Sequence, residues 1–463
     1  MKNEKDVQVL SDSEFATKPI VPLLWKYALL GLFGLVLQAS SVIADGIFVG
    51  AGVGAMGLAT IGIIAPLWTI TVAFVSLFGS GGATVAAVKK GNGDLEGAAK
   101  VYNTVIVSAF AFAAMLSLLA LIFLDELLLL LGATTEIMPN ARAYALPYFI
   151  GFPFCIAGST ACAFARIDER PLAAAITLVL SSLTAITTEY IMLVKLNWGM
   201  EGAAIPWVIC VGGPCIIFVY LQAKSSLLKL SFRNLKPDFS ILWKAVKIGF
   251  PFFAMPICAT AATILINNLI VNYDGGEINV AAFGIINAYV AYILSIFGST
   301  LTGGMQPIAS YNMGAKLYLR VKKVLEAVLV QSTAIMAVAV LLVLVFAKNI
   351  VIAFAGNDPV LVPVAVDIIR VYLLLYAVGN ISQIAAGYFQ SVERTGLALL
   401  NGISKIIIFT VPICLILSSM MGVQGIWIAQ PIADALAGAL GLFLILKECR
   451  YLGKPHKTEG VLA

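Results

Sequence analysis

Residues 61–87 read IGIIAPLWTITVAFVSLFGSGGATVAA, and residues 283–309 read FGIINAYVAYILSIFGSTLTGGMQPIA. Each stretch begins with a Gly-Ile-Ile run and carries a Gly-Gly pair at the same spacing from it. The tripeptide Leu-Trp-Lys likewise occurs at 24–26 and again at 242–244. Features that recur in the same order along a chain indicate an internal duplication. The sequence therefore predicts two halves of similar design.

The composition predicts a protein dissolved in lipid. Of the 463 residues, 61% are hydrophobic and 11% are charged, whereas a soluble domain carries roughly 25% charged residues. Residues 1–18 are polar and contain no apolar core of a cleavable signal peptide, so we expect the first membrane helix to direct insertion. The seven cysteines form no CxxC pair and are odd in number. We therefore expect no disulfide framework, no metal site and no cofactor beyond a coupling ion.

A membrane-spanning helix needs about 20 mostly apolar residues, and twelve segments meet this requirement. They predict an all-α membrane protein with twelve transmembrane helices in two parallel six-helix repeats around a central cavity. We expect cytoplasmic tails at 1–19 and 447–463, an N-lobe at 20–224, a linker at 225–241 and a C-lobe at 242–446. The twelve segments are 20–47, 57–88, 98–124, 139–165, 171–194, 202–223, 242–272, 279–312, 322–347, 361–391, 396–420 and 423–446.

Basic residues predict the orientation, because loops rich in Lys and Arg stay in the cytoplasm. Of the 29 Lys and Arg residues, Arg370 and Lys405 lie within predicted spans. Only Arg142, Lys195 and Lys348 fall on one side of the membrane, and the other 24 fall on the opposite side with both termini. We therefore expect both termini in the cytoplasm of a bacterium, with the chain in its cytoplasmic membrane. Net charge +5 follows from this bias and does not indicate nucleic-acid binding.

Two carboxylates in the N-lobe are candidates for ion coupling, because charges within membrane helices are rare and costly. Asp45 lies late in the first helix, and Gln38, seven residues earlier, lies on nearly the same face. Glu189 follows Thr188 in a hydroxyl-rich fifth helix. Asp45 either binds a proton or sodium or is a hydrated helix end. Glu189 either shares the coupling site with Asp45, or lies in a hydrogen-bonded helix contact with its carboxylate extending toward the outer surface.

Together, these residues define a predicted cation-coupling site of Asp45, Glu189, Gln38 and Thr188. Two neighbouring carboxylates can share one proton, since like charges in a low-dielectric site raise one pKa. They can equally form an oxygen cage for sodium. The residues leave these alternatives open.

In the C-lobe, Lys405 and Asp434 both lie within apolar runs. They are either a structural ion pair, which we favour, or direct contacts for a substrate. Amide and tyrosine side chains in several helices have the polarity of a cavity lining, although tyrosine is also common at membrane interfaces. The predicted substrate cavity comprises Tyr148, Asn267, Asn287, Tyr289, Asn380, Gln383, Lys405 and Asp434.

At these residues the chain resembles the MATE family, the multidrug and toxic compound extrusion transporters, and is nearest to its MepA-like branch. The resemblance runs from about residue 20 to residue 446. The matching elements are DGIFVG at 45–50, GNGD at 91–94, the Glu-Arg turns in FARIDER at 164–170 and FQSVER at 389–394, GMEGAA at 199–204, and PIASYNMGA at 307–315.

The resemblance implies a twelve-helix fold of two lobes and antiport of organic cations against protons or sodium. It places the family's first-helix aspartate on Asp45 and the fifth-helix acid on Glu189, where the family more often has Asp. Some members carry acids in the seventh and tenth helices, where this chain has amides such as Asn267 and Asn380. Helix six has Pro206-Trp207 where a hydroxyl is common.

The predicted function is therefore a cation-coupled (proton or sodium) multidrug efflux antiporter that exports lipophilic organic cations by alternating access, acting as a monomer. The alternative is a flippase for a lipid-linked or amphipathic metabolite. The cavity of a flippase would need many basic residues to hold a pyrophosphate, and the candidate basic residues within the membrane are mainly Lys405 and Arg370. The chain is not expected to be an enzyme, because no catalytic cluster is apparent.

Overall fold

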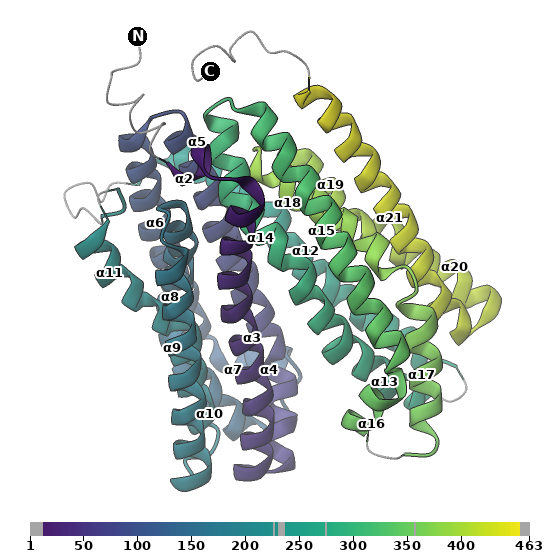
Figure 1. Ribbon diagram of the computed structural model, residues 1–463. Coiled ribbons are helices and arrows are strands. Elements are labelled where there is room, and N and C mark those ends of the chain that lie inside the picture. Colours follow the sequence, from purple (N-terminus) through teal and green to yellow (C-terminus); the bar gives the residue numbers. More distant parts are fainter. Residues whose placement is uncertain (1–12, 226, 230–236, 274–275, 356–357, 454–463) are drawn as a thin grey trace. The chain divides into compact units, whose positions relative to one another are not determined.

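The computed structural model describes residues 13–225, 227–229, 237–273, 276–355 and 358–453, and every regular element in these ranges is a helix. Figure 1 shows them as long, neighbouring ribbons. The first half contains α2 (Glu14–Thr17), α3 (Ile20–Gly52), α4 (Ala55–Val75), η1 (Ser76–Ser80), α5 (Gly81–Gly91), α6 (Leu95–Ile122), α7 (Leu124–Leu130), α8 (Met138–Ile167), α9 (Pro171–Glu189), η2 (Tyr190–Lys195), α10 (Glu201–Gly212), η3 (Gly213–Cys215) and α11 (Ile216–Lys224). The second half contains α12 (Phe239–Val271), α13 (Gly276–Ile285), η5 (Ile286–Ala291), α14 (Tyr292–Gly314), α15 (Tyr318–Val345), α16 (Ala347–Ala355), α17 (Leu361–Tyr372), α18 (Tyr376–Ser391), α19 (Thr395–Ile403), η6 (Ser404–Thr410), α20 (Val411–Met421) and α21 (Val423–Leu452).

The helices agree with the predicted number of membrane spans. Within the described ranges, eleven helices are long and apolar enough to cross a membrane, and a twelfth arises if α17 and α18 form one bent span. These two helices replace the single predicted segment 361–391 and meet at a bend of 54°. The predicted linker 225–241 and the tail 447–463 lie partly outside the described residues, and α21 extends to Leu452.

Contacts divide the chain into two units whose bounds differ from the lobes expected from sequence. Unit 1 contains Leu29–Phe253 and the described residues before Phe15, and unit 2 contains Phe15–Ala28 and the chain from Ala254 onward. The start of α3 therefore belongs to unit 2, and the start of α12 belongs to unit 1. Corresponding helices of the two halves are divided in the same way, as a duplication predicts.

The repeated Gly-Gly pair permits these helix starts to pack closely. In unit 1, a Cβ atom added at Gly81 would lie 2.1 Å from the carbonyl oxygen of Ala245, and one added at Gly249 would lie 2.0 Å from that of Leu77. In unit 2, a Cβ atom added at Gly304 would lie 3.1 Å from the carbonyl oxygen of Leu24. Glycine allows such backbone approach because it has no side chain. The motif thus positions the N-terminal parts of α12 and α3.

Each unit is organised around one central helix. In unit 1, α8 contacts α4, α6, α9 and α10, and in unit 2, α18 contacts α14, α15, α19 and α21. Both central helices end in the repeated Glu-Arg turn. Glu169 and Glu393 each have φ 61°, a left-handed conformation that is uncommon for residues other than glycine. The matching turns show that the duplication extends to backbone detail.

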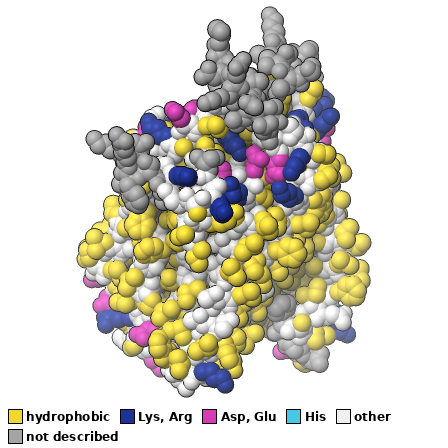
Figure 2. All heavy atoms as spheres, turned by 60° about the vertical axis from the view of Figure 1, so that its left-hand side comes forward, with side chains coloured by type: hydrophobic (Ala, Val, Ile, Leu, Met, Phe, Trp, Pro, Cys, Tyr) yellow, Lys and Arg dark blue, Asp and Glu magenta, His cyan; other side chains and the backbone are white. Residues whose placement is uncertain are grey.

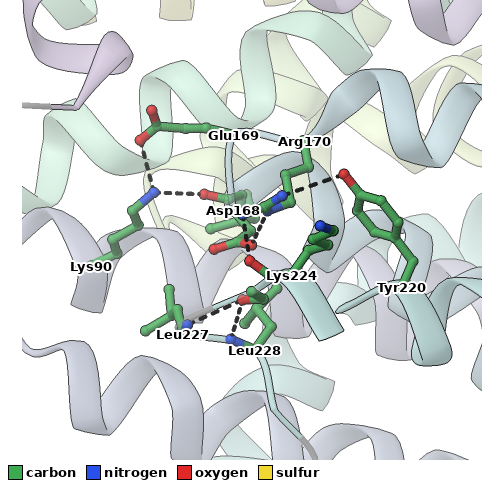
Figure 3. A network of polar contacts seen from close by, with 10 residues as sticks. Lys90, Asp168, Glu169, Arg170, Tyr220, Lys224, Leu227 and Leu228 are labelled. Atoms are coloured by element: carbon green, nitrogen blue, oxygen red, sulfur yellow. Dashed lines mark hydrogen bonds and ion pairs between the residues drawn. The ribbon is translucent and has the colours of Figure 1, made fainter. Parts of the chain in front are cut away.

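A polar network fixes the end of α8 in unit 1 (Figure 3). The ammonium of Lys90 donates to the carbonyl of Ile167 at 2.9 Å and to the carboxylate of Glu169 at 2.8 Å. Arg170 binds Asp168 at 2.9 Å and donates to Tyr220 at 3.3 Å. These contacts join the ends of α5, α8 and α11.

The surface has the polarity that a bilayer requires. Figure 2 shows hydrophobic side chains over the middle of the visible face, with charged groups gathered toward its upper and lower ends. Large apolar side chains are exposed on many helices, among them Phe33, Ile47, Leu118 and Val330. Such exposure is expected where the solvent is lipid rather than water.

Candidate functional site

The structure brings Asp45 and Glu189 together in unit 1. Asp45 lies near the end of α3, and Glu189 is the last residue of α9, immediately before the π-helical segment η2. Both side chains are buried, with 6% and 3% exposure, and their carboxyl groups lie within hydrogen-bonding range of each other. π-helical turns often occur at functional sites. The two predicted acids therefore form one buried centre.

This contact has a direct chemical consequence. An ionised carboxylate can only accept hydrogen bonds, so a hydrogen bond between two carboxyl groups requires a proton on one of them. Two ionised carboxylates in such close contact would repel each other. Among the described residues, Oε1 of Glu189 has no hydrogen-bond partner. The pair thus needs one positive charge to be stable while it is buried.

Hydroxyl and thiol groups adjoin the acids. The side chains of Ser41 on α3 and Ser182 on α9 are hydrogen-bonded to the thiol of Cys210 on α10, with 3.7 Å between Ser182 Oγ and Cys210 Sγ. Cys210 in turn lies within electrostatic range of Glu189. Three helices therefore meet around the carboxyl pair. Cys210 is not among the site residues predicted from the sequence.

An aromatic cluster adjoins the same centre through Tyr144. Tyr144 lies within electrostatic range of both acids, and its hydroxyl accepts from Trp68 Nε1 at 3.1 Å. Trp68 stacks on Trp207 with ring centroids 6.4 Å apart, and Tyr148 lies 4.7 Å from Trp207. The hydroxyl of Tyr148 donates to the carbonyl of Leu67 at 2.7 Å. Tyr144 and Tyr148 are buried, and Trp68 and Trp207 are partly buried.

The other two predicted coupling residues are less closely connected. Gln38 and Thr188 are both partly buried. In the part of the chain that the structure describes, neither side chain makes a hydrogen bond to Asp45 or Glu189. The shared helical face of Gln38 and Asp45 therefore does not produce a bonded cluster, and the role of both residues stays a prediction.

In unit 2, Lys405 and Asp434 form the ion pair that one of the two interpretations requires. Lys405 Nζ lies 2.7 Å from Asp434 Oδ1 and 4.7 Å from the centre of the Tyr376 ring. Gln430 Nε2 lies 3.4 Å from the other carboxylate oxygen. Asp434 is fully buried.

The remaining predicted cavity residues are distributed over separate pairs. Asn287 donates to Thr263 at 3.3 Å, and Asn380 donates to Ser332 at 3.1 Å. Tyr289 is 41% exposed, and Gln383 and Asn267 are partly buried. No group of three or more His, Cys, Asp or Glu side chains with metal-binding geometry occurs among the described residues.

The duplicated helices and the charged groups buried within them define a class: a membrane transporter with two repeats. A family model described as MatE matches residues 32–191 and 251–416, which is more than half of the chain. The chain therefore belongs to the MATE family and is a transporter rather than an enzyme. This confirms the family expected from the sequence motifs.

Comparison with individual proteins agrees with this membership. The multidrug export protein MepA of Staphylococcus haemolyticus is 25% identical over 433 residues, covering 93% of this chain and 94% of the relative. MepA of Staphylococcus aureus strain MRSA252 is 24% identical over 437 residues, with the same coverage. A crystal structure of a MATE protein in complex with MaD3S has a TM-score of 0.87 at 19% identity, covering 98% of this chain and 100% of that one. An outward-facing MATE structure has a TM-score of 0.86.

Proposed function

We propose that this chain is a proton-coupled multidrug exporter that exchanges lipophilic organic cations for protons at the Asp45–Glu189 pair. The proton and the organic cation occupy the pair alternately, as the two lobes open to one side of the membrane and then to the other. Both termini lie in the cytoplasm, and the working unit is a monomer in a bacterial cytoplasmic membrane.

The observation that carries this proposal is the close approach of two buried carboxyl groups. It calls for one positive charge, which a bound proton supplies. A lipophilic cation supplies the same charge, and the nearby rings of Trp68, Tyr144 and Trp207 add cation–π contacts of roughly 0.5–2 kcal/mol each. Proton and substrate therefore compete to supply the one positive charge that the carboxyl pair needs, and this competition is the basis of antiport.

The comparisons support export as the direction. The MepA relatives are named multidrug export proteins, and the alignment covers nearly the whole of both chains. The distribution of Lys and Arg supports the cytoplasmic position of both termini. Sodium is the alternative coupling ion, and the direct contact between the carboxyl groups favours the smaller proton.

A flippase for a lipid pyrophosphate is less well supported. Its cavity would need free bases, and both candidates in the spans are paired. Lys405 binds Asp434, and Arg370, on an exposed part of α17, lies 4.0 Å from Asp367.

Transport by the purified protein in proteoliposomes tests the proposal. A proton gradient and a sodium gradient are imposed separately, and the flux of a permanent lipophilic cation such as tetraphenylphosphonium is followed. The proposal predicts uphill flux with the proton gradient alone. Flux that follows only the sodium gradient would replace the proton with sodium, and no flux with either gradient would contradict cation antiport.

A further inference from the structure

A pocket of about 400 Å³ lies within unit 2, where the chain enters its first long helix. Residues 19–22, at the start of α3, form one wall, and Arg320, Lys323 and Ala327 of α15 form the other. All of these residues belong to the same unit. The coupling site proposed above lies in unit 1 and does not use this pocket, so the pocket calls for a separate explanation.

The two walls of the pocket are held against each other. The indole Nε1 of Trp25 on α3 donates to Oε1 of Gln331 on α15 at 2.8 Å. Nη2 of Arg320 donates to the carbonyl of Phe15 at 3.0 Å and to that of Lys18 at 2.7 Å, in the segment that precedes α3. The pocket is therefore a fixed feature of unit 2 rather than a gap between loosely packed helices.

Two basic side chains line the pocket without an acid to neutralise them. Within the described ranges, the ion pair of α15 joins Lys322 to Glu326 at 3.7 Å, and neither Arg320 nor Lys323 takes part in one. Lys323 is exposed. Arginine has five N–H donors, and the bonds to the two carbonyls use only those of Nη2, so others remain for an anion. The pocket thus presents uncompensated positive charge.

The rest of the pocket is apolar and continues onto the lipid-facing surface. Residues 19–22 read Pro-Ile-Val-Pro, and Val21 is 45% exposed. Arg320, Lys323, Ala327 and Val330 are spaced by three or four residues, so they share one face of α15. Val330 is 67% exposed. An apolar surface therefore leads from the basic rim toward the middle of the span, as a ligand with an anionic head and a long apolar tail requires.

The two bases lie at the depth of lipid headgroups. The 28 residues of α15 extend over about 42 Å of helix, whereas the hydrocarbon core of a bilayer is about 30 Å thick. The ends of α15 therefore reach into the headgroup region, and Arg320 and Lys323 occupy its first two turns. Basic pockets between membrane helices at this level are typical binding sites for anionic lipid headgroups.

We propose that this pocket binds an anionic phospholipid, with the headgroup phosphate on Arg320 and Lys323 and an acyl chain along Ala327 and Val330. The orientation proposed above puts the site in the cytoplasmic leaflet. The inference goes beyond the proposed function, because it concerns neither the coupling acids nor the transported cation. The bound lipid holds the start of α3, the helix that carries Asp45, against α15.

The test measures lipid binding by native mass spectrometry on the full chain purified in detergent. The probes are dioleoylphosphatidylglycerol, which is anionic, and dioleoylphosphatidylcholine, which has the same acyl chains and no net charge. The variant is Lys323→Gln. Its matched control is Lys322→Gln, which removes the same charge from the adjacent residue, outside the pocket. Glycerol 3-phosphate, which offers the phosphate without acyl chains, serves as a competitor.

We expect the wild type to bind phosphatidylglycerol at least about tenfold more tightly than phosphatidylcholine, because two basic residues contact the phosphate. Lys323→Gln should weaken phosphatidylglycerol binding about fivefold, the usual effect of one basic residue at a membrane surface, and leave phosphatidylcholine binding unchanged. Lys322→Gln should change either affinity by less than about twofold, since its charge is already paired at the surface. Glycerol 3-phosphate at the concentration of the lipid should not displace it.

Equal binding of the two lipids by the wild type would overturn the inference. Equal losses in Lys323→Gln and Lys322→Gln would also overturn it, because they would reflect the general charge at this end of α15 rather than the pocket. Displacement of the lipid by glycerol 3-phosphate would show a site for free phosphate instead. These outcomes leave the proposed function intact, because cation flux in proteoliposomes is measured separately.

Discussion

The carboxyl groups of Asp45 on α3 and Glu189 on α9 lie within hydrogen-bonding range of each other in the buried interior of unit 1. They come from two helices that are far apart in the sequence, and each lies at or near the C-terminal end of its helix. Their contact turns two costly charges into one centre that must hold a single positive charge. The first two predictions below follow from this relationship.

Replacing Asp45 by Asn should abolish proton-driven export of tetraphenylphosphonium, because the amide keeps the shape but cannot exchange a proton. We expect a loss of more than about tenfold in uphill flux, with a normal elution profile in size-exclusion chromatography. The matched control is Ser40→Ala on the same helix, whose hydroxyl donates to the carbonyl of Val36. Near wild-type uphill flux in Asp45→Asn would rule out this role.

Glu189→Gln should be non-additive with Asp45→Asn, since residues of one network share their free energy. Once one acid is removed, the other no longer has to share a proton, and the second substitution should have little further effect on flux. A double-mutant cycle on transport rates measures this coupling. Strictly additive losses would show that the two carboxyl groups act independently.

The N-cap of α6 predicts a pH-dependent contribution to stability. Asp94 accepts from Lys89 Nζ at 2.7 Å and from the amide of Gly97 at 2.7 Å, and the Lys89 hydrogen bond, followed by that of Gly97, holds the pKa of Asp94 below its usual value. A lowered pKa stabilises the fold above the unfolded pKa of about 3.9. This stabilisation is lost as the pH falls through the lower folded value.

Asp94→Ala should therefore lower the free energy of unfolding by about 1 kcal/mol at neutral pH, the usual effect of removing an N-cap. Asp94→Asn keeps the cap and should cost less, because only the exposed ion pair is lost. Thermal unfolding in detergent at pH 7 and near pH 4 measures both. The stability difference between wild type and Asp94→Asn should shrink as the pH falls. A difference that grows would contradict this prediction.

Close helix packing predicts that Gly249 cannot be enlarged. A Cβ atom there would lie 2.0 Å from the carbonyl oxygen of Leu77, so Gly249→Ala must displace backbone and should destabilise unit 1 by about 1–3 kcal/mol. Gly284→Ala is the control, because a Cβ atom there meets nothing within 4 Å. The melting temperatures of the two variants should differ clearly, and equal values would contradict the packing described here.

Much of this fold follows from the sequence, because the length of apolar runs and their duplication are local properties. The pairing of Asp45 with Glu189 was also predictable, since two buried acids in one half need a partner. The aromatic residues near the pair could not be predicted, because Trp68 and Trp207 lie in apolar runs. In such runs, a packing residue and a binding residue have the same sequence pattern. The partners of Gln38 depend on how neighbouring helices rotate, which helical periodicity does not specify. The bend between α17 and α18 contains no proline to signal it.

Proton release on substrate binding is the most direct test of competition at Asp45 and Glu189. Tetraphenylphosphonium is added to the purified chain in weakly buffered solution near neutral pH, and the protons released are counted with a pH indicator. We predict about one proton released per cation bound in the wild type, and none in the variant that combines Asp45→Asn with Glu189→Gln. Binding by the wild type without any proton release would contradict exchange of proton and substrate at this pair.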